Sequence, residues 1–320
     1  MKEKTLCIKT IVGMLIMLLV CSMAAACSKG PVSEKPASDT APATSEIIED
    51  PAVSYLGPEG TYTEEAAKLF FSDGEFRPRE TVDDAIADVV EGNADYAVIP
   101  QENTLGGAVT NYIDALIAED GVYVIGEVII PINQTLMALP GASIEDIRTV
   151  CSHAQGIAQS AEWRKEHLPD AETQEMASTA AAASYVSETG DKTIAAIAAP
   201  GAAELYGLSV LAENVQITDA NKTRFYVLSS IGLKEEGEAQ KNAVFVASCE
   251  ANLIDDIIVE IHDAGVELVT IHDRPEGSQL GTYNYIIEVE NEAGFTDKLI
   301  EDIDSIPEVH FLGSFNVKEK

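Results

Sequence analysis

The foldable part of the sequence begins with short apolar runs that alternate with amphipathic helical patterns. Strands are predicted at residues 53–56, 96–99, 122–128, 148–151 and 193–197. Helices are predicted at residues 64–71, 109–117, 157–166, 179–188 and 201–206. Because strands that alternate with helices are typical of βαβ units, the pattern predicts an α/β domain at residues 52–231 with a mostly parallel sheet.

A second pattern follows a charged, glycine-containing break at residues 235–238 (EEGE). It predicts, in order, a strand at 243–249, a helix at 253–263, strands at 266–271 and 283–289, a helix at 295–303 and a strand at 309–315. This order, βαββαβ, is that of a ferredoxin-like sandwich. We therefore predict a separate small domain at residues 242–318.

The first residues have the pattern of an export signal. Lys2, Lys4 and Lys9 give a basic start, residues 11–20 form an apolar stretch that is short for a membrane span, and three alanines precede Cys27. The AAAC ending resembles a bacterial lipobox, which implies a signal peptide at residues 1–26 and diacylglycerol on Cys27. The expected location is extracytoplasmic, lipid-anchored to the cell membrane; an uncleaved signal anchor is the alternative.

The next segment has the composition of a tether. From Cys27 to residue 51 the chain consists largely of Pro, Ser, Ala, Thr and Glu, with little apolar periodicity. Such a segment cannot bury enough apolar surface to fold. We therefore predict that residues 27–51 are disordered and join the membrane anchor to the first folded domain.

The charge of the chain narrows the function classes. Its 320 residues include 20 Lys and Arg against 54 Asp and Glu, a net charge of -34. This charge would repel nucleic acid, so nucleic-acid binding is excluded, and it gives no attraction to an anionic bilayer. It would also repel an anionic ligand at long range, so a site for such a ligand must use local donors and a local cation.

The cysteines do not predict a metal site. The chain has five of them, with no CxxC pair and no histidine at metal-ligand spacing. Cys151 and Cys249 each end an apolar run in a different predicted domain. We interpret both as buried free thiols.

Polar and glycine residues gather where predicted strands pass into helices. The segments are residues 57–63 (GPEGTYT), 102–107 (ENTLGG), 152–156 (SHAQG) and 178–179 (ST). Helix N-termini bind anions through free backbone N–H groups, and open α/β sheets bind ligands beyond the carboxyl ends of their strands. Each segment alone is also explained as a helix cap or a turn. Four of them at successive strand ends predict a site for a carboxylate ligand.

A hydroxyl and a guanidinium, those of Thr223 and Arg224, stand just before the apolar run at residues 226–228. Adjacent residues of a strand point to opposite faces, so a cap and a surface cation are the alternative interpretation of this pair.

Taken together, these segments resemble the prephenate dehydratase family along residues 55–317. The matching blocks are GPEGTYT at 57–63, PQENT at 100–104 with Gly107 following, SHAQGI at 152–157, STAAA at 178–182, AAELYGL at 202–208 and NKTRF at 221–225. The departures are Gln134 in place of a common His, Ile217 in place of the Asp that usually precedes the last block, and Gln101, Thr104 and Ala154 in place of Ile, Ser and Pro.

The resemblance implies a two-lobed fold like that of type II periplasmic binding proteins. It also implies decarboxylating dehydration of prephenate to phenylpyruvate, water and carbon dioxide, a step of phenylalanine biosynthesis that uses no metal or other cofactor. Thr223 is then the donor to the leaving hydroxyl, and Arg224 supplies positive charge to the site. The implied substrate-binding residues are Asn103, Thr104, Gly107, Ser152, Gln155, Thr179 and Phe225.

The C-terminal pattern resembles an ACT domain, a sensor that in this family binds phenylalanine between subunits. The regulatory motif corresponds to residues 271–275, in which Arg274 and Pro275 are retained. The motif that opens the first helix corresponds to residues 251–253, in which Leu253 is retained and the glycine is lost. The resemblance implies a homodimer or higher homo-oligomer, with phenylalanine as a candidate effector.

Export conflicts with the cytoplasmic origin of prephenate, and a different class of function therefore stays open. A lipid-anchored binding or sensing protein for an aromatic or carboxylate ligand is the alternative, because a cleft can keep its ligand after catalysis is lost. The retained Thr223 and Arg224 favour catalysis, whereas Gln134 and Ile217 favour binding. A structural or adhesive role is the remaining alternative.

Overall fold

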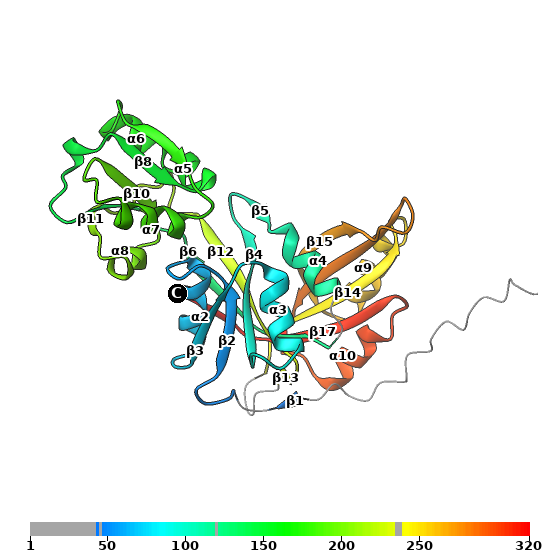
Figure 1. Cartoon of the computed structure of the whole chain (residues 1–320). Helices are drawn as coiled ribbons and strands as arrows, with labels where there is room; N and C mark the ends of the chain where they lie inside the picture. The colour runs from blue at the N-terminus through cyan, green and yellow to red at the C-terminus, as the bar shows by residue number, and fades with distance from the viewer. Residues whose placement is uncertain (1–42, 45–46, 119–120, 234–238) are drawn as a thin grey trace, which may run out of the picture. The chain divides into compact units, whose positions relative to one another are not determined.

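The computed structural model describes residues 43–44, 47–118, 121–233 and 239–320 (Figure 1). The predicted signal peptide, Cys27, most of the predicted tether and the break at residues 235–238 lie outside these ranges. Within the described ranges, no helix is both long enough and apolar enough to cross a bilayer. The chain forms mixed α/β structure, as predicted.

Helices occur at every place where the sequence predicts one. They are α2 (Tyr62–Phe70), α3 (Val82–Val90), α4 (Thr110–Ala118), α5 (Ala154–Gln159), α6 (Ala161–His167), α7 (Thr179–Thr189), α8 (Gly201–Leu205), α9 (Ile254–Asp263) and α10 (Asp297–Asp304), with a 3₁₀ turn η1 at Ile144–Asp146. The helix predicted at 157–166 is divided at Ser160, whose hydroxyl donates to the carbonyl of Gly156 at 2.7 Å. Helix α3 was not predicted, although its buried Val82, Ile86 and Val89 lie at helical spacing.

The first large sheet contains the strand that carries Thr223. Its strands are β2 (Ala52–Leu56), β3 (Glu75–Arg79), β4 (Tyr96–Asn103), β5 (Gly107–Ala108), β6 (Tyr123–Pro131), β12 (Lys222–Ser229) and β18 (Val317–Glu319). The order is β18-β6-β12-β4-β2-β3, with β5 paired to β4. Strand β12 runs antiparallel to both β4 and β6, so the sheet is mixed, whereas the pairs β2–β3, β2–β4 and β6–β18 are parallel. The chain returns to the middle of this sheet from the second one, which reverses the direction of β12.

The second sheet has the order β11-β7-β10-β8-β9. Its strands are β7 (Thr135–Ala138), β8 (Thr149–Ser152), β9 (Glu172–Glu175), β10 (Ile194–Ala198) and β11 (Ser209–Ala212). It is also mixed, because β8 is parallel to β9 and β10 while β7 is antiparallel to β10 and β11. A separate two-stranded pair joins β1 (Ala43–Thr44) to β13 (Gly232–Leu233).

The C-terminal elements confirm the predicted order βαββαβ. Strands β14 (Asn242–Glu250), β15 (Glu267–Pro275), β16 (Thr282–Glu290) and β17 (Val309–Phe315) form an antiparallel sheet in the order β15-β16-β14-β17. Phe245 and Ile287 of the sheet share a core with Ile261 of α9 and Ile303 of α10. The helices therefore bury one face of this sheet.

The opposite face of the C-terminal sheet shares a core with the first large sheet. Val244, Ile286 and Phe315 pack in one cluster with Ile99 of β4 and Tyr226 of β12. Strand β18 follows directly and adds to the first sheet, parallel to β6. The last part of the chain is thus joined to the Thr223 strand by apolar packing and by a backbone ladder.

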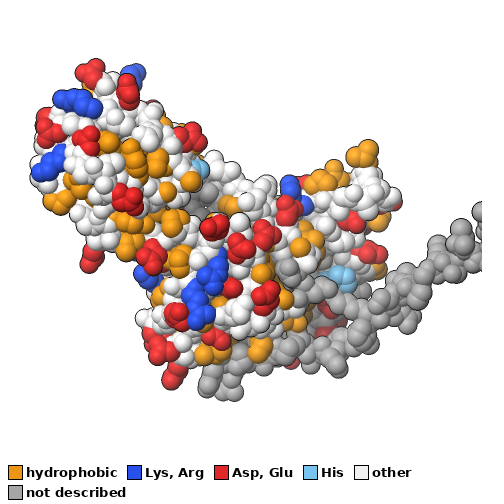
Figure 2. Space-filling model, viewed as in Figure 1, with side chains coloured by type: hydrophobic (Ala, Val, Ile, Leu, Met, Phe, Trp, Pro, Cys, Tyr) orange, Lys and Arg blue, Asp and Glu red, His pale blue; other side chains and the backbone are white. Residues whose placement is uncertain are grey.

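The acidic side chains and the two described cysteines lie where the sequence predicts them, at the surface and in the core respectively. Figure 2 shows Asp and Glu side chains spread over the visible face, in keeping with the net charge of -34. Cys151 and Cys249 are buried and free, as predicted.

Candidate functional site

Thr223 lies at the start of β12, opposite Asn103 at the end of β4. Its side chain is buried, with 8% of the residue exposed. Asn103 Nδ2 donates a hydrogen bond to Thr223 Oγ1 at 2.8 Å. Because the hydroxyl oxygen is the acceptor here, the hydroxyl proton stays available for donation to another group.

Asn103 joins segments that are distant in the sequence. Its Oδ1 accepts hydrogen bonds from the backbone N–H groups of Leu105 (3.1 Å) and Gly106 (2.9 Å) and from Gln155 Nε2 (3.0 Å). A Cβ atom on Gly106 would lie 3.0 Å from Gln155 Nε2, so the glycine leaves room for this contact. The structure therefore brings together Thr223, Asn103 and Gln155, three of the predicted site residues.

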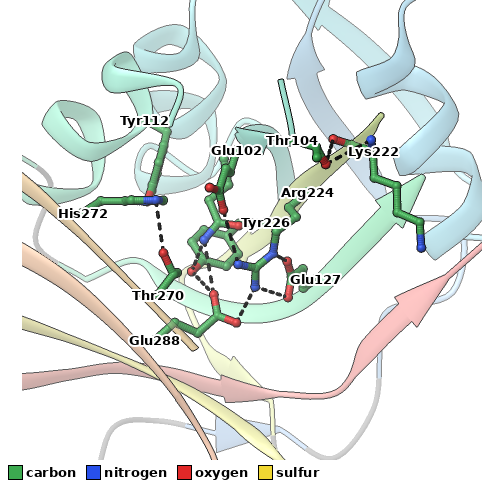
Figure 3. A network of polar contacts seen from close by, with 11 residues as sticks. Glu102, Thr104, Tyr112, Glu127, Lys222, Arg224, Tyr226, Thr270, His272 and Glu288 are labelled. Atoms are coloured by element: carbon green, nitrogen blue, oxygen red, sulfur yellow. Dashed lines mark hydrogen bonds and ion pairs between the residues drawn. The ribbon is translucent and has the colours of Figure 1, made fainter. Parts of the chain in front are cut away.

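The turn that follows Asn103 is hydrogen-bonded to the first residue of β12 through Thr104. The backbone N–H and the hydroxyl of Thr104 donate to the carbonyl of Lys222 at 2.9 and 3.1 Å, as the contacts in Figure 3 indicate for the hydroxyl. The N–H of Lys222 donates to the Thr104 hydroxyl at 3.2 Å. Gly107 closes the turn with a φ of +74°, a value that favours glycine. Thr104 and Gly107 thus hold the backbone next to Thr223.

Asn221 is a site residue that was not predicted from the sequence. It is buried, with 1% exposed, and its Oδ1 accepts from Asn103 Nδ2 at 2.9 Å. Within the described ranges, Asn221 Nδ2 has no hydrogen-bond partner. A buried donor without a partner costs about 1–3 kcal/mol, so this amide is suited to a ligand oxygen. Its place in the NKTRF block was the available signal.

Three other predicted site residues, Ser152, Phe225 and Thr179, contact the backbone, pack in the core or begin a helix. Ser152 is fully buried, and its hydroxyl donates to the carbonyl of Ile197 at 2.7 Å. Phe225 packs in the apolar core on the Thr223 face of the first sheet. Thr179 is the first residue of α7, where Ser178 caps the helix by accepting from the N–H of Ala181 at 2.9 Å. The structure does not join these three to the Thr223 hydroxyl by any described hydrogen bond.

Arg224 points to the other face of β12 and is surrounded by carboxylates (Figure 3). It donates to Glu127 through Nε and through Nη2, the latter at 2.9 Å, and Nη2 also donates to Glu288. Glu102 lies 3.6 Å from Nη1. The side chains of Glu127 and Glu288 are fully buried. This geometry does not favour the predicted cationic role of Arg224 beside Thr223, because its charge is matched on the opposite face.

The carboxylate group of Glu288 extends this network into neighbouring strands. Tyr226 O–H donates to Glu288 Oε2 at 2.7 Å, and Gln101 Nε2 donates to the same atom at 3.2 Å. Burial and the charge of Glu288 raise the pKa of Tyr226 well above its usual value. Gln101, one of the departures from the family pattern, is therefore part of a buried polar network.

We expect Glu127 to make the free energy of unfolding depend on pH. Burial, opposed by the Arg224 hydrogen bond and reinforced by the charge of Glu288, raises the pKa of Glu127 to about 7 from an ordinary 4.5. Between these values the folded protein binds more protons than the unfolded chain, so this residue's contribution to stability falls as pH rises through that window. We expect Glu127→Gln to remove this contribution and to flatten the pH dependence.

The measurement is the free energy of unfolding in denaturant at several pH values from 4.5 to 7.5, for the wild type and Glu127→Gln. Glu292→Gln is the matched control, because Glu292 is exposed and its removal changes the net charge equally. Parallel wild-type and Glu127→Gln curves would contradict the expectation.

The predicted regulatory residues lie in the C-terminal domain. Arg274 Nε and Nη2 both contact the carboxylate of Asp114 in α4 at 2.6 Å. Pro275 ends β15, and Leu253 is exposed immediately before α9. Arg274 therefore links the C-terminal sheet to a helix beside the first sheet.

Known proteins are similar to this chain over most of its length. The profile of the family described as prephenate dehydratase matches residues 53–232. A bifunctional chorismate mutase/prephenate dehydratase of Neisseria gonorrhoeae is 35% identical over 239 residues, which cover 74% of this chain but only 66% of that protein, just under two thirds. A prephenate dehydratase of Lactococcus lactis is 30% identical over 276 residues, covering 83% of this chain and 97% of the relative.

A solved structure agrees with these relatives. The prephenate dehydratase of Arthrobacter aurescens, in complex with L-Phe, superposes with a TM-score of 0.74 at 33% identity, covering 82% of this chain and 89% of that one. The family profile covers more than half of the chain, and the Lactococcus relative is covered almost completely. This chain belongs to the prephenate dehydratase family.

Proposed function

We propose that this protein catalyses the conversion of prephenate to phenylpyruvate, carbon dioxide and water. The observation that supports it best is the Thr223 hydroxyl, which accepts from Asn103 and keeps its own proton for donation. It lies in a site where Asn103, Gln155 and Asn221 supply amide groups. Family membership supports the reaction, and the geometry around Thr223 supports its proposed role as the donor.

The reaction needs a donor at the leaving oxygen. Prephenate loses its ring carboxylate as carbon dioxide, the electron pair of the broken carbon–carbon bond completes the aromatic ring, and the ring hydroxyl leaves. One proton is taken up overall, so that the hydroxyl departs as water. A threonine hydroxyl is a weak acid, so Thr223 acts by hydrogen bonding to the oxygen as negative charge develops on it. Holding the ring against this donor supplies the alignment.

We propose that neutral amide donors near Thr223 recognise a substrate carboxylate, in place of the local cation that the sequence predicted. Both cations that flank it are already paired, Lys222 with Glu319 and Arg224 with Glu127 and Glu288. Asn221 Nδ2 is a buried amide donor beside Asn103. Amide donors held in place by other hydrogen bonds stabilise an oxyanion without a full cation.

A soluble form that begins at Ser28 tests the proposal. We expect it to convert prephenate to phenylpyruvate, followed by the absorbance of phenylpyruvate. If it forms no phenylpyruvate while prephenate still raises its melting temperature, the protein is a binding or sensing protein and the catalytic proposal is wrong.

We further propose that the C-terminal βαββαβ domain is an ACT domain that responds to phenylalanine. The Arthrobacter relative was solved with L-Phe bound, and Arg274 and Pro275 of the regulatory motif are retained here. The measurement is the prephenate turnover with and without L-phenylalanine. If L-phenylalanine changes neither the rate of prephenate turnover nor the melting temperature, this proposal is wrong.

We also propose that the protein is exported and anchored through Cys27. The basic start, the short apolar stretch and the AAAC ending support this. In a bacterial host, we expect the full chain to partition with membranes and to gain the mass of a diacylglycerol group at Cys27. Cys27→Ala should lose the lipid mass, with Cys21→Ala as the control that keeps it. A wild-type protein without lipid would show that the anchor is wrong.

A further inference from the structure

The residues on either side of Thr223 are both cations, and each pairs with a carboxylate from the C-terminal part of the chain. Lys222 pairs with Glu319 of β18, and Arg224 pairs with Glu288 of β16. The Lys222 pair is exposed, with 47% and 55% of the two side chains accessible, whereas the Glu288 side chain is fully buried. Exposed pairs hold a backbone weakly, so the buried pair is the stronger constraint on β12.

Glu288 holds two residues of β12 at once. Arg224 and Tyr226 lie on the same face of the strand, and both end on this carboxylate, Arg224 on Oε1 and Tyr226 on Oε2 at 2.7 Å (Figure 3). Gln101 of the neighbouring strand β4 also donates to Oε2 at 3.2 Å. One buried anion therefore fixes the position of adjacent segments of β12 and β4.

The contacts of Glu288 bear directly on the position of Thr223, because the pairing of β12 with β4 is irregular next to it. The pairing of β12 with β4 shifts register between Arg224 and Phe225, so the ladder is irregular directly after the Thr223 segment. Irregularities of this kind re-aim side chains next to active sites. Asn103 holds Thr223 on one face of β12, and Arg224, the last residue before the irregularity, is anchored to Glu288 on the other face.

We propose that Glu288 of the C-terminal domain is a positioning residue for the reaction, which sets the orientation of the Thr223 hydroxyl through Arg224. This inference rests on the proposed function, because it takes Thr223 as the donor. The C-terminal domain then completes the geometry of the catalytic strand, in addition to any effector that it binds.

Glu288→Gln in the full soluble protein tests the inference. The substitution keeps the size of the side chain and an oxygen for Tyr226, but it removes one of the two buried charges that hold Arg224, and Glu127 keeps the other. We expect kcat to fall by at least about ten-fold and KM to stay within about two-fold, because a contact made in the transition state is misplaced. Glu292→Gln, an exposed carboxylate just after the same strand, is the control and should keep the wild-type kcat.

A double-mutant cycle separates positioning from a general loss of structure. If Glu288 acts through Thr223, Glu288→Gln combined with Thr223→Val is no slower than Thr223→Val alone. If Glu288→Gln does not fold, Arg224→Lys replaces it, because lysine keeps the charge but cannot reproduce the forked guanidinium contacts with Glu127 and Glu288.

The outcomes are distinguishable. A wild type that does not turn over prephenate refutes the proposed function and this inference with it. An active wild type refutes the inference alone if Glu288→Gln keeps its kcat, or if the effects of Glu288→Gln and Thr223→Val simply multiply. A fall in kcat that disappears in the Thr223→Val background supports it.

Discussion

Thr223→Val is expected to lower kcat for prephenate by about 10²–10⁴-fold while the protein stays folded. Valine has nearly the shape of threonine but has no hydroxyl proton, so the leaving oxygen loses its donor. The Asn103 amide loses one acceptor, but it keeps Asn221 Oδ1 at 2.9 Å. The fold should therefore survive the change.

Steady-state kinetics with a melting curve for each variant measures this effect. Thr223→Ser keeps the hydroxyl and should retain most of the rate, and Thr173→Val on the exposed strand β9 controls for loss of a threonine elsewhere. If Thr223→Val and the wild type turn over prephenate equally fast, another group is the donor.

Arg224→Leu is expected to reduce the free energy of unfolding by about 3–5 kcal/mol, the largest stability effect that we predict. The substitution leaves the carboxylates of Glu127 and Glu288 buried without their shared cation. Because desolvated charges without a partner are unfavourable, the native state can recover part of the loss only by binding protons. The loss should therefore be smaller at pH 5 than at pH 8.

Equilibrium unfolding in denaturant at both pH values provides the measurement. Arg77→Leu is the matched control, because Arg77 forms an ion pair with Glu75 at the protein surface and its loss should have little effect. An Arg224→Leu protein as stable as Arg77→Leu would show that the buried network does not contribute to the fold.

Much of the local structure could be predicted because its cause is local. Helices such as α9 show buried Ile257 and Ile261 at helical spacing, and the C-terminal elements follow the predicted order. Strands β3, β7, β9 and β11 were not predicted; β9 is exposed along its whole length, so it has no alternation of apolar residues to find. The predicted helix is divided at Ser160, where φ is -98° and ψ is 4°, a local departure from helical geometry that periodicity does not report.

Part of the site could also be predicted, because some of its residues lie in recognisable local motifs. Asn103, Gln155 and Thr223 stand in blocks whose polar residues mark strand and helix ends, and the fold brings them together. Ser152 and Phe225 belong to the same blocks but serve packing and backbone contacts. A motif therefore identified the region of the site but not the role of each member.

The sequence by itself determined the family, the βαββαβ order of the C-terminal elements and the position of the hydroxyl at Thr223, because each depends on patterns within short segments of the chain. Only the tertiary structure decided what Arg224 does. Its partners Glu127 and Glu288 are 97 and 64 residues away, on β6 and β16. The strand order and register put these charges on the face opposite Thr223, and neither can be read from the local pattern.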